Sequence, residues 1–292
     1  MINLNRLQMF VAVVDAGSFT AAADSLGTTK AVVSFNVKQL EQELGVALLT
    51  RSTRRLALTP AGEGFHASCS RLLHDADAAV DQARSGQTAL SGSLRVTASV
   101  DYGNRIVVPA LAAFARLHPA LRVAYQASSA QADLIGERLD VAIRVGALAD
   151  SSHRATRIGE FKLLLVASPA LLAEHGTPRS LDALAALPWL ANRPGRSDHW
   201  RLTDSKGREH ALRVAPVAQA DTASALLAFA ESGCGVAALP DWLLEEPLAR
   251  GALQRVLPSY ALPRQPVCAV YPDTRHVSAK VRRFIDFLRT GK

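Results

Sequence analysis

The stretch that decides the fold runs from Phe10 to Phe65 and reads FVAVVDAGSFTAAADSLGTTKAVVSFNVKQLEQELGVALLTRSTRRLALTPAGEGF. Its apolar residues recur every three or four positions in three short segments, each followed by a glycine. This is the pattern of short amphipathic helices with glycine at the C-cap. A tight turn at Gly27 joins the second and third segments, which predicts a helix-turn-helix. The three helices are expected before Gly17, over 19–26 and over 30–44.

The third predicted helix buries one stripe of apolar residues and leaves a polar face for a partner. Free N–H groups at its start favour phosphate oxygens, and its outer face suits a DNA groove. The segment over 46–59, VALLTRSTRRLALT, alternates and turns around Ser52-Thr53, which predicts a basic β-hairpin, called the wing below. A bundle of helices without a DNA partner is the less favoured alternative. The expected DNA contacts are Phe19, Thr28, Thr29, Lys30, Val32, Ser34, Phe35, Asn36, Lys38, Gln39, Arg51, Arg54 and Arg55.

Three consecutive motifs, SFTAAADSLG, KQLEQELGVALLTR and TRRLALTPAG, closely resemble the N-terminal domain of LysR-type transcriptional regulators. They occur in the family's order and at its spacing. The sequence departs from the family's usual pattern at two places. Thr29, Lys30 and Ala31 stand where the family usually has Ser-Gln-Pro, and Phe35 stands where it usually has an arginine.

Length, charge and cysteine content bound the remaining possibilities. The 292 residues are enough for about two domains. The net charge of +7 lies outside the first 88 residues, where eight Lys and Arg balance eight Asp and Glu, so the DNA prediction rests on the local arginines instead.

The start of the chain shows no export signal, and no apolar run could span a bilayer. Three widely spaced cysteines favour neither disulfides nor zinc, and buried thiols are preferred to a redox sensor.

A long helix is expected from Thr59-Pro60 onward, because Thr suits the N-cap and Pro the first helical position. Its small or apolar residues follow a nearly heptad spacing, which favours pairing with a second copy of the helix. Packing against its own domain is the alternative, and it is disfavoured because the preceding domain looks too small to cover the helix. The segment 85–92 is the expected hinge. The proposed seam comprises Phe65, Cys69, Leu72, Ala76, Ala79 and Ala83.

Beyond the hinge, strands and helices alternate, which predicts an α/β fold. The motifs GSLRVTAS, FARLHPALRV, LDVAIRVG, LLVASPALLAEHG and VRRFIDFLR resemble the effector-binding domain of the LysR family, which is related to periplasmic binding proteins. The resemblance implies a winged helix-turn-helix over 1–59, a linker or dimerisation helix and hinge over 60–91, and an effector domain over 92–292. Within that domain it implies lobe one at 92–160 and 267–292, and lobe two at 161–266.

An effector is expected between these lobes, at the carboxyl ends of strands. Hydroxyl groups, helix N-termini and one guanidinium in these places suit a small organic anion or an amphiphilic metabolite. Some of these side chains have structural alternatives, since Ser128 and Thr222 suit helix caps and Arg144 could pair with Asp140 or Asp133. Asp101 is unusual, because its carboxylate would oppose an anionic ligand. The candidates are Ser99, Val100, Asp101, Tyr102, Ser128, Arg144, Gly146, Asn192 and Thr222.

The motifs for hydrolases, metalloproteases and nucleotide-binding enzymes do not occur, so no enzyme, cofactor or metal site is expected. The segment 233–238 fits G-x-G-x-x-A, but it follows a predicted helix and precedes a strand, the reverse of a dinucleotide-binding turn. The expected partners are a double-stranded DNA operator, a small-molecule effector, further copies in a homodimer or homotetramer, and RNA polymerase, with no membrane partner. The expected location is the cytoplasm. The alternative function is a solute-binding protein of the periplasmic type.

Overall fold

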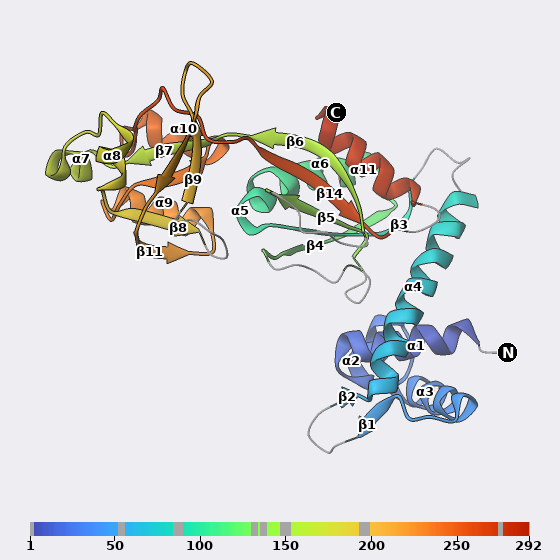
Figure 1. Ribbon diagram of the computed structural model, residues 1–292. Helices are drawn as coiled ribbons and strands as arrows, with labels where there is room; N and C mark the ends of the chain where they lie inside the picture. The colour runs from blue at the N-terminus through green and yellow to red at the C-terminus, as the bar shows by residue number, and fades with distance from the viewer. Residues whose placement is uncertain are drawn as a thin grey trace.

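The computed structural model describes residues 3–51, 56–83, 90–129, 134, 139–146, 153–192, 199–273 and 277–291. A helical N-terminal domain lies at one end of a long helix, and two α/β lobes lie beyond its other end (Figure 1). This arrangement confirms the predicted fold class. The turn at Ser52-Thr53 and residues 85–89 of the expected hinge lie outside the described residues.

Short helices and a two-stranded hairpin make up the N-terminal domain, and local signals set their ends. Ser18 and Thr29 accept hydrogen bonds from N–H groups in the first turns of the helices they precede. Gly17 and Gly45 end helices with positive φ angles of 61° and 69°. The elements are α1 (Leu4–Ala16), α2 (Phe19–Ser25), α3 (Lys30–Leu44), β1 (Leu49–Arg51) and β2 (Leu56–Leu58).

The long helix α4 (Pro60–Ala83) corrects the predicted seam. Thr59 caps its start, accepting a hydrogen bond from Gly62 N at 2.9 Å. Cys69 is buried in the core of its own domain, and Phe65 packs against the same core, so the N-terminal half of the seam does not face a second copy. The prediction failed because three short helices and the wing are together large enough to cover these turns. The large apolar side chains that α4 leaves exposed are Leu72 and Val80, at 49% and 47%.

Lobe one contains a five-stranded sheet in the order β4-β3-β5-β14-β6, in which β3 runs parallel to β4 and β5. Helices α6 and α11 supply Phe114 and Phe284 to the main core on one face of this sheet. The first helical stretch contains one π-helical turn, η1. The elements are β3 (Gly92–Ala98), α5 (Val100–Tyr102), η1 (Gly103–Val107), α6 (Val108–Leu117), β4 (Leu121–Ala127), β5 (Val141–Val145), β6 (Arg154–Phe161), β14 (Gln265–Tyr271) and α11 (Ala279–Thr290).

The described residues of lobe two form several small sheets and four helices. Leu190 N donates to the Val236 carbonyl, and Val236 N donates to the Pro188 carbonyl. These bonds join the parallel pair β8 and β11 to the antiparallel strands β12, β7 and β13. The elements are β7 (Leu163–Ala167), α7 (Pro169–His175), α8 (Leu181–Ala185), β8 (Trp189–Asn192), β9 (His199–Thr203), β10 (Glu209–Arg213), β11 (Pro216–Ala220), α9 (Ala223–Glu231), β12 (Ala237–Pro240), α10 (Asp241–Ala249) and β13 (Gln254–Arg255).

Two turns of lobe two follow from its prolines and glycines. Strand β10 ends at Arg213 and β11 begins only at Pro216, since proline lacks the N–H that a continuous ladder needs. Gly233, with φ of 79°, ends α9 before the chain enters β12. The glycine-rich segment is therefore a helix end and a turn, as its position in the sequence predicts.

The chain passes between the lobes twice, once from β6 to β7 and once from β13 to β14. Strands β6 and β14 pair antiparallel, from Phe161 opposite Gln265 to Arg154 opposite Tyr271. Figure 1 shows this pair of strands extending from lobe one toward lobe two. Two strands that connect two compact bodies allow a change of angle between them.

Candidate DNA-binding face and interlobe site

Helix α3 presents two contrasting faces. Val33, Val37 and Leu40 are buried in the core of the N-terminal domain. On the outer face, Val32 is 41% exposed and Phe35 is 61% exposed. Two uncovered apolar side chains at helical spacing on an otherwise polar face suit contact with thymine methyl groups in a major groove.

The other residues predicted to contact DNA divide into three groups. Lys30 and Lys38 are exposed on α3, while Thr29 caps the helix and Thr28 and Ser34 are half-buried. Three side chains already have partners within the domain: Phe19 packs against the core, Asn36 donates to the carbonyl of Val32, and Gln39 donates to Gln42. Arg51 ends β1, but its side chain and the residues Arg54 and Arg55 lie outside the described part of the chain.

Two residues that the sequence did not indicate fix the wing beside α3. The Oε1 atom of Glu41 accepts hydrogen bonds from the backbone N–H groups of Leu48 and Leu49 at 2.8 and 3.1 Å. Gly62 of α4 lies so close to the Leu48 carbonyl that a Cβ atom would overlap it. Helix α3, the wing and helix α4 are therefore held in a fixed arrangement by these contacts.

In lobe one, backbone pairing gathers several predicted effector contacts at one edge of the sheet. Ser99 N donates to the Ile143 carbonyl at 3.3 Å, and Ser128 N donates to the Ala98 carbonyl at 2.9 Å. The ends of β3, β4 and β5 therefore place Ser99, Ser128 and Arg144 beside one another. Val100 follows Ser99 in α5, and Gly146, with φ of 85°, follows β5.

At the start of η1 in lobe one, the chain approaches β3 and β4 closely. A Cβ atom on buried Gly103 would overlap the hydroxyl of Tyr125 and crowd Ala98. The pKa of Tyr125 is raised by burial, and the nearby positive charge of Arg144 acts in the opposite direction. Arg144 therefore lies close enough to this corner to influence it electrostatically.

In lobe two, Asn192 ends β8, and Thr222 follows the neighbouring parallel strand β11 as the N-cap of α9. Asn192 ends β8 and pairs with Ala220 at the end of β11, and α9 begins shortly afterwards. The Thr222 hydroxyl accepts a hydrogen bond from Ala225 N at 3.3 Å, so this side chain has the capping role that was its structural alternative. Asn192 is exposed at the same edge.

The two lobes meet through specific contacts. The carboxylate of Asp101 accepts a hydrogen bond from the N–H of Ala223, the first residue of α9, at 2.6 Å. Tyr102 of lobe one packs edge-on against Trp242 of lobe two, with ring centroids 5.7 Å apart, and both rings also lie near Phe161. Burial raises the pKa of the Tyr102 hydroxyl. Ala223, Trp242 and Phe161 had no signal in the sequence, because they come together only in the fold.

Two buried polar atoms near this junction lack partners among the described residues: the Ser99 hydroxyl and the indole N–H of Trp242. Ser99 stands at the N-cap of α5 without capping it. Buried polar atoms in proteins nearly always have a hydrogen-bond partner. One orphan from each lobe therefore suits hydrogen bonds to a small molecule or to water at this junction.

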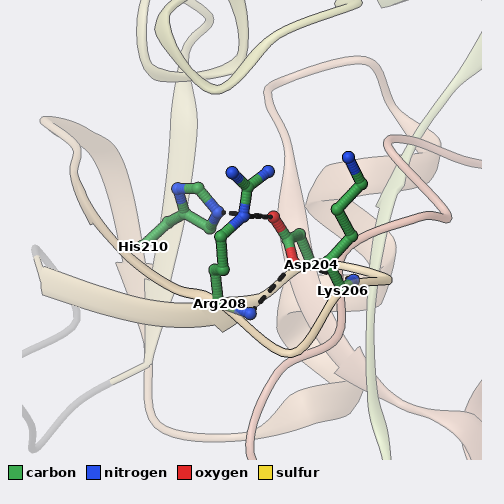
Figure 2. A network of polar contacts seen from close by, with 4 residues as sticks. All are labelled: Asp204, Lys206, Arg208 and His210. Carbon is green, nitrogen blue, oxygen red and sulfur yellow. Dashed lines mark hydrogen bonds and ion pairs between the residues drawn. The ribbon is translucent and has the colours of Figure 1, made fainter.

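A further polar network lies on the hairpin of β9 and β10 (Figure 2). Asp204 accepts hydrogen bonds from the backbone of Arg208 and Lys206, and its carboxylate also contacts the Arg208 guanidinium and His210. The Arg208 N–H is the largest cause holding the pKa of Asp204 well below its ordinary range, followed by His210. All these contacts lie within one hairpin, between Asp204 and His210, so the network stabilises the hairpin rather than forming a site.

Within the described residues, no group of three or more His, Cys, Asp or Glu could hold a metal ion, and no helix is long and apolar enough to cross a membrane.

Comparison with known proteins places both halves of the chain. Residues 4–63 match the family described as bacterial regulatory helix-turn-helix protein, lysR family, and residues 87–292 match the LysR substrate binding domain. The regulator PtxR of Pseudomonas aeruginosa is 38% identical over 291 residues, which are 99% of this chain and 92% of PtxR.

Solved structures agree with this assignment over the full length. AphB, a virulence activator of Vibrio cholerae, has a TM-score of 0.61 and 30% identity, covering 98% of both chains. CrgA of Neisseria meningitidis, a LysR-type transcriptional regulator, has a TM-score of 0.61 and 33% identity, covering 100% of this chain and 99% of CrgA.

Proposed function

This chain belongs to the LysR family of DNA-binding transcriptional regulators with an effector-binding domain, and on that premise we propose which of its residues carry the two binding functions. The family assignment leaves the predicted periplasmic solute-binding alternative without support. It also agrees with the expectation of a regulator rather than an enzyme, since the matched relatives are regulators.

For DNA, we place the outer face of α3 in the major groove. The observation that carries this proposal is the exposure of Val32 and Phe35 on a helix whose opposite face is buried. Lys30 at the start of α3 and Lys38 on its exposed surface supply positive charge toward the phosphates. Arg51, Arg54 and Arg55 of the wing are proposed to contact adjacent phosphates or the minor groove.

For the effector, the proposed site lies where the two lobes meet. Its polar groups come from Ser99, Ser128 and Arg144 of lobe one, and from Asn192 and the indole N–H of Trp242 in lobe two. A small molecule that contacts both groups stabilises one angle between the lobes over another. Only that difference in affinity can change operator binding, and a tenfold change requires about 1.4 kcal/mol.

The proposed assembly is a homodimer or homotetramer, acting on DNA in the cytoplasm together with RNA polymerase. Leu72 and Val80 on α4 support it, because they are exposed apolar side chains on a long helix that extends away from the N-terminal domain. Related regulators form oligomers through which two helix-turn-helix units meet two half-sites.

The effector site can be tested with two conservative substitutions. Ser99→Ala and Trp242→Phe each remove one orphan polar atom and keep most of the side chain's volume. A metabolite that raises the melting temperature of the wild-type protein should bind these variants at least about fivefold more weakly, a loss of roughly 1 kcal/mol for one hydrogen bond. Ser232→Ala, at a site in lobe two away from the junction, is the control. Unchanged affinity in both variants would place the effector elsewhere.

A further inference from the structure

Asp101 reaches from lobe one to the start of a helix in lobe two. Its Oδ2 atom accepts the Ala223 N–H at 2.6 Å, although the two residues are 122 positions apart in the sequence. The start of a helix favours a carboxylate ligand, because unpaired N–H groups and the helix dipole meet there. In this chain that place is already taken by a carboxylate of the protein.

The position of Asp101 is fixed by its surroundings. Gly103, two residues later, lets the helix pack tightly against Tyr125 and Ala98. Tyr102, the next residue, is held between Phe161 and Trp242. Within α9 the Thr222 hydroxyl binds Ala225 N, so it does not compete for Ala223 N. The contact between the lobes is therefore a short hydrogen bond between two groups that are each held in place.

We propose that Asp101 is a tethered anionic ligand of lobe two: it holds the lobes together at α9 without an effector and excludes a carboxylate group of the effector from that helix. The proposal rests on the proposed interlobe effector site and sharpens its specificity. The effector leaves the start of α9 to Asp101 and presents to this side chain a neutral group or a hydrogen-bond donor. An organic anion that bound at α9 would face the Asp101 charge at close range.

Removal of the side chain should create a site for a small free carboxylate. In Asp101→Ala, formate can enter the vacated space and accept the Ala223 N–H. In the full-length protein, 100 mM sodium formate should raise the melting temperature of Asp101→Ala by about 2–4 °C more than sodium chloride of equal ionic strength does. The wild-type protein should show no such difference. Asp182→Ala, which removes an exposed first-turn aspartate of α8, is the control and should also show none.

A distance measurement between two spin labels reports directly on the separation of the two lobes. Cys234 is exposed in lobe two, whereas Cys69 and Cys268 are buried, so one spin label can be placed on Cys234 and another on Arg122→Cys of the exposed edge strand β4. The labelled protein is diluted with unlabelled protein to suppress distances between copies. Asp101→Ala should give a longer or broader distance distribution than the wild type, and formate should not restore it, because the free anion is not attached to lobe one. Asp101→Asn should keep the wild-type distance, because its amide oxygen can still accept the hydrogen bond.

The proposal is overturned if Asp101→Ala keeps the wild-type distance and responds to formate no more than to chloride. If this variant does not fold, Asp101→Ser vacates most of this space and allows the same two readings. The melting temperature and the spin-label distance are both measured without DNA and without an added effector. The proposed function would fail if the wild-type protein bound neither DNA nor an effector. That result is distinguishable from a failure of this inference.

Discussion

The proposed DNA-binding face and the junction between the lobes differ in whether their side chains have partners within the protein. On the outer face of α3, Val32 and Phe35 are not covered by any of the described residues. At the junction, Asp101 binds Ala223, and Tyr102 packs against Trp242, so the protein supplies most of its own partners there. We propose that the first surface meets a rigid external duplex. At the second, we propose that a small ligand changes an existing contact.

The largest expected effect separates the two faces of the N-terminal domain. Phe10 is fully buried in its core, and Phe35 is exposed. Phe10→Ala should lower the free energy of unfolding of this domain by ~3–5 kcal/mol, whereas Phe35→Ala should leave stability within about 0.5 kcal/mol and weaken operator binding. Calorimetry and DNA titration measure the two quantities. If Phe35→Ala melted earlier and bound DNA normally, the assignment of the faces would be wrong.

The next effect concerns assembly. Leu72→Glu would place a charge within the exposed apolar surface of α4 that we propose to lie between two copies. The variant should shift toward monomer and lose at least about tenfold in affinity for a two-half-site operator, because the two units no longer bind together. Light scattering and DNA titration provide the measurements. Arg71→Glu, an exposed neighbour, is the control, and equal dissociation of both variants would contradict a specific role for Leu72.

A pair of glycines tests how the wing is held. In Gly62→Ala, the new Cβ overlaps the Leu48 carbonyl, whereas Gly64 has nothing within 4 Å of the same position. Gly62→Ala should lower the free energy of unfolding by ~1–3 kcal/mol and loosen the wing. Gly64→Ala should raise it by up to about 1 kcal/mol, since alanine is the better helix former. Chemical denaturation measures both, and equal stability of the two variants would mean that α4 and the wing are not in close contact.

The smallest effect lies in lobe two, away from both sites. The pKa of Asp204 is held below its ordinary range, so its carboxylate stabilises the hairpin when ionised. This contribution is present above the ordinary pKa of aspartate and is lost as the pH falls toward the lowered value. Asp204→Asn should therefore be less stable than the wild type at pH 7, and the difference should shrink on acidification below about pH 4. Thermal melts across this range test it, and a difference that grew on acidification would have the wrong sign.

The sequence predicted elements whose ends carry local signals. Helix α3 spans the residues predicted for it, because Thr29 caps one end and Gly45 ends the other. Prediction from the sequence failed where residues distant in the chain determine how an element packs. The repeating residues of α4 cannot reveal that Phe65 and Cys69 face their own domain. The sequence does not predict strands β6, β9 and β10, because they are short or mostly exposed and lack a clear apolar alternation.

The same division applies to the candidate sites. Parallel strands bring Ser99, Ser128 and Arg144 to one edge, as their places after strands suggest. The partner of Asp101 could not be predicted, because a backbone N–H at the start of a helix in the other lobe leaves no mark on side-chain sequence. Likewise, the orphan indole of Trp242 becomes visible only when the lobes are placed together.

The central claim, that the outer face of α3 and the wing read DNA, is tested most directly by one salt titration. Fluorescence anisotropy follows binding of full-length protein to the duplex upstream of its own gene, with a random duplex as control, for the wild type and for Arg54→Ala/Arg55→Ala. We predict that the logarithm of the wild-type affinity falls linearly with that of the salt concentration. The double variant should reduce the slope by roughly one unit for each phosphate that the wing no longer neutralises. An unchanged slope, or equal affinity of the wild type for both duplexes at every salt concentration, would contradict this claim.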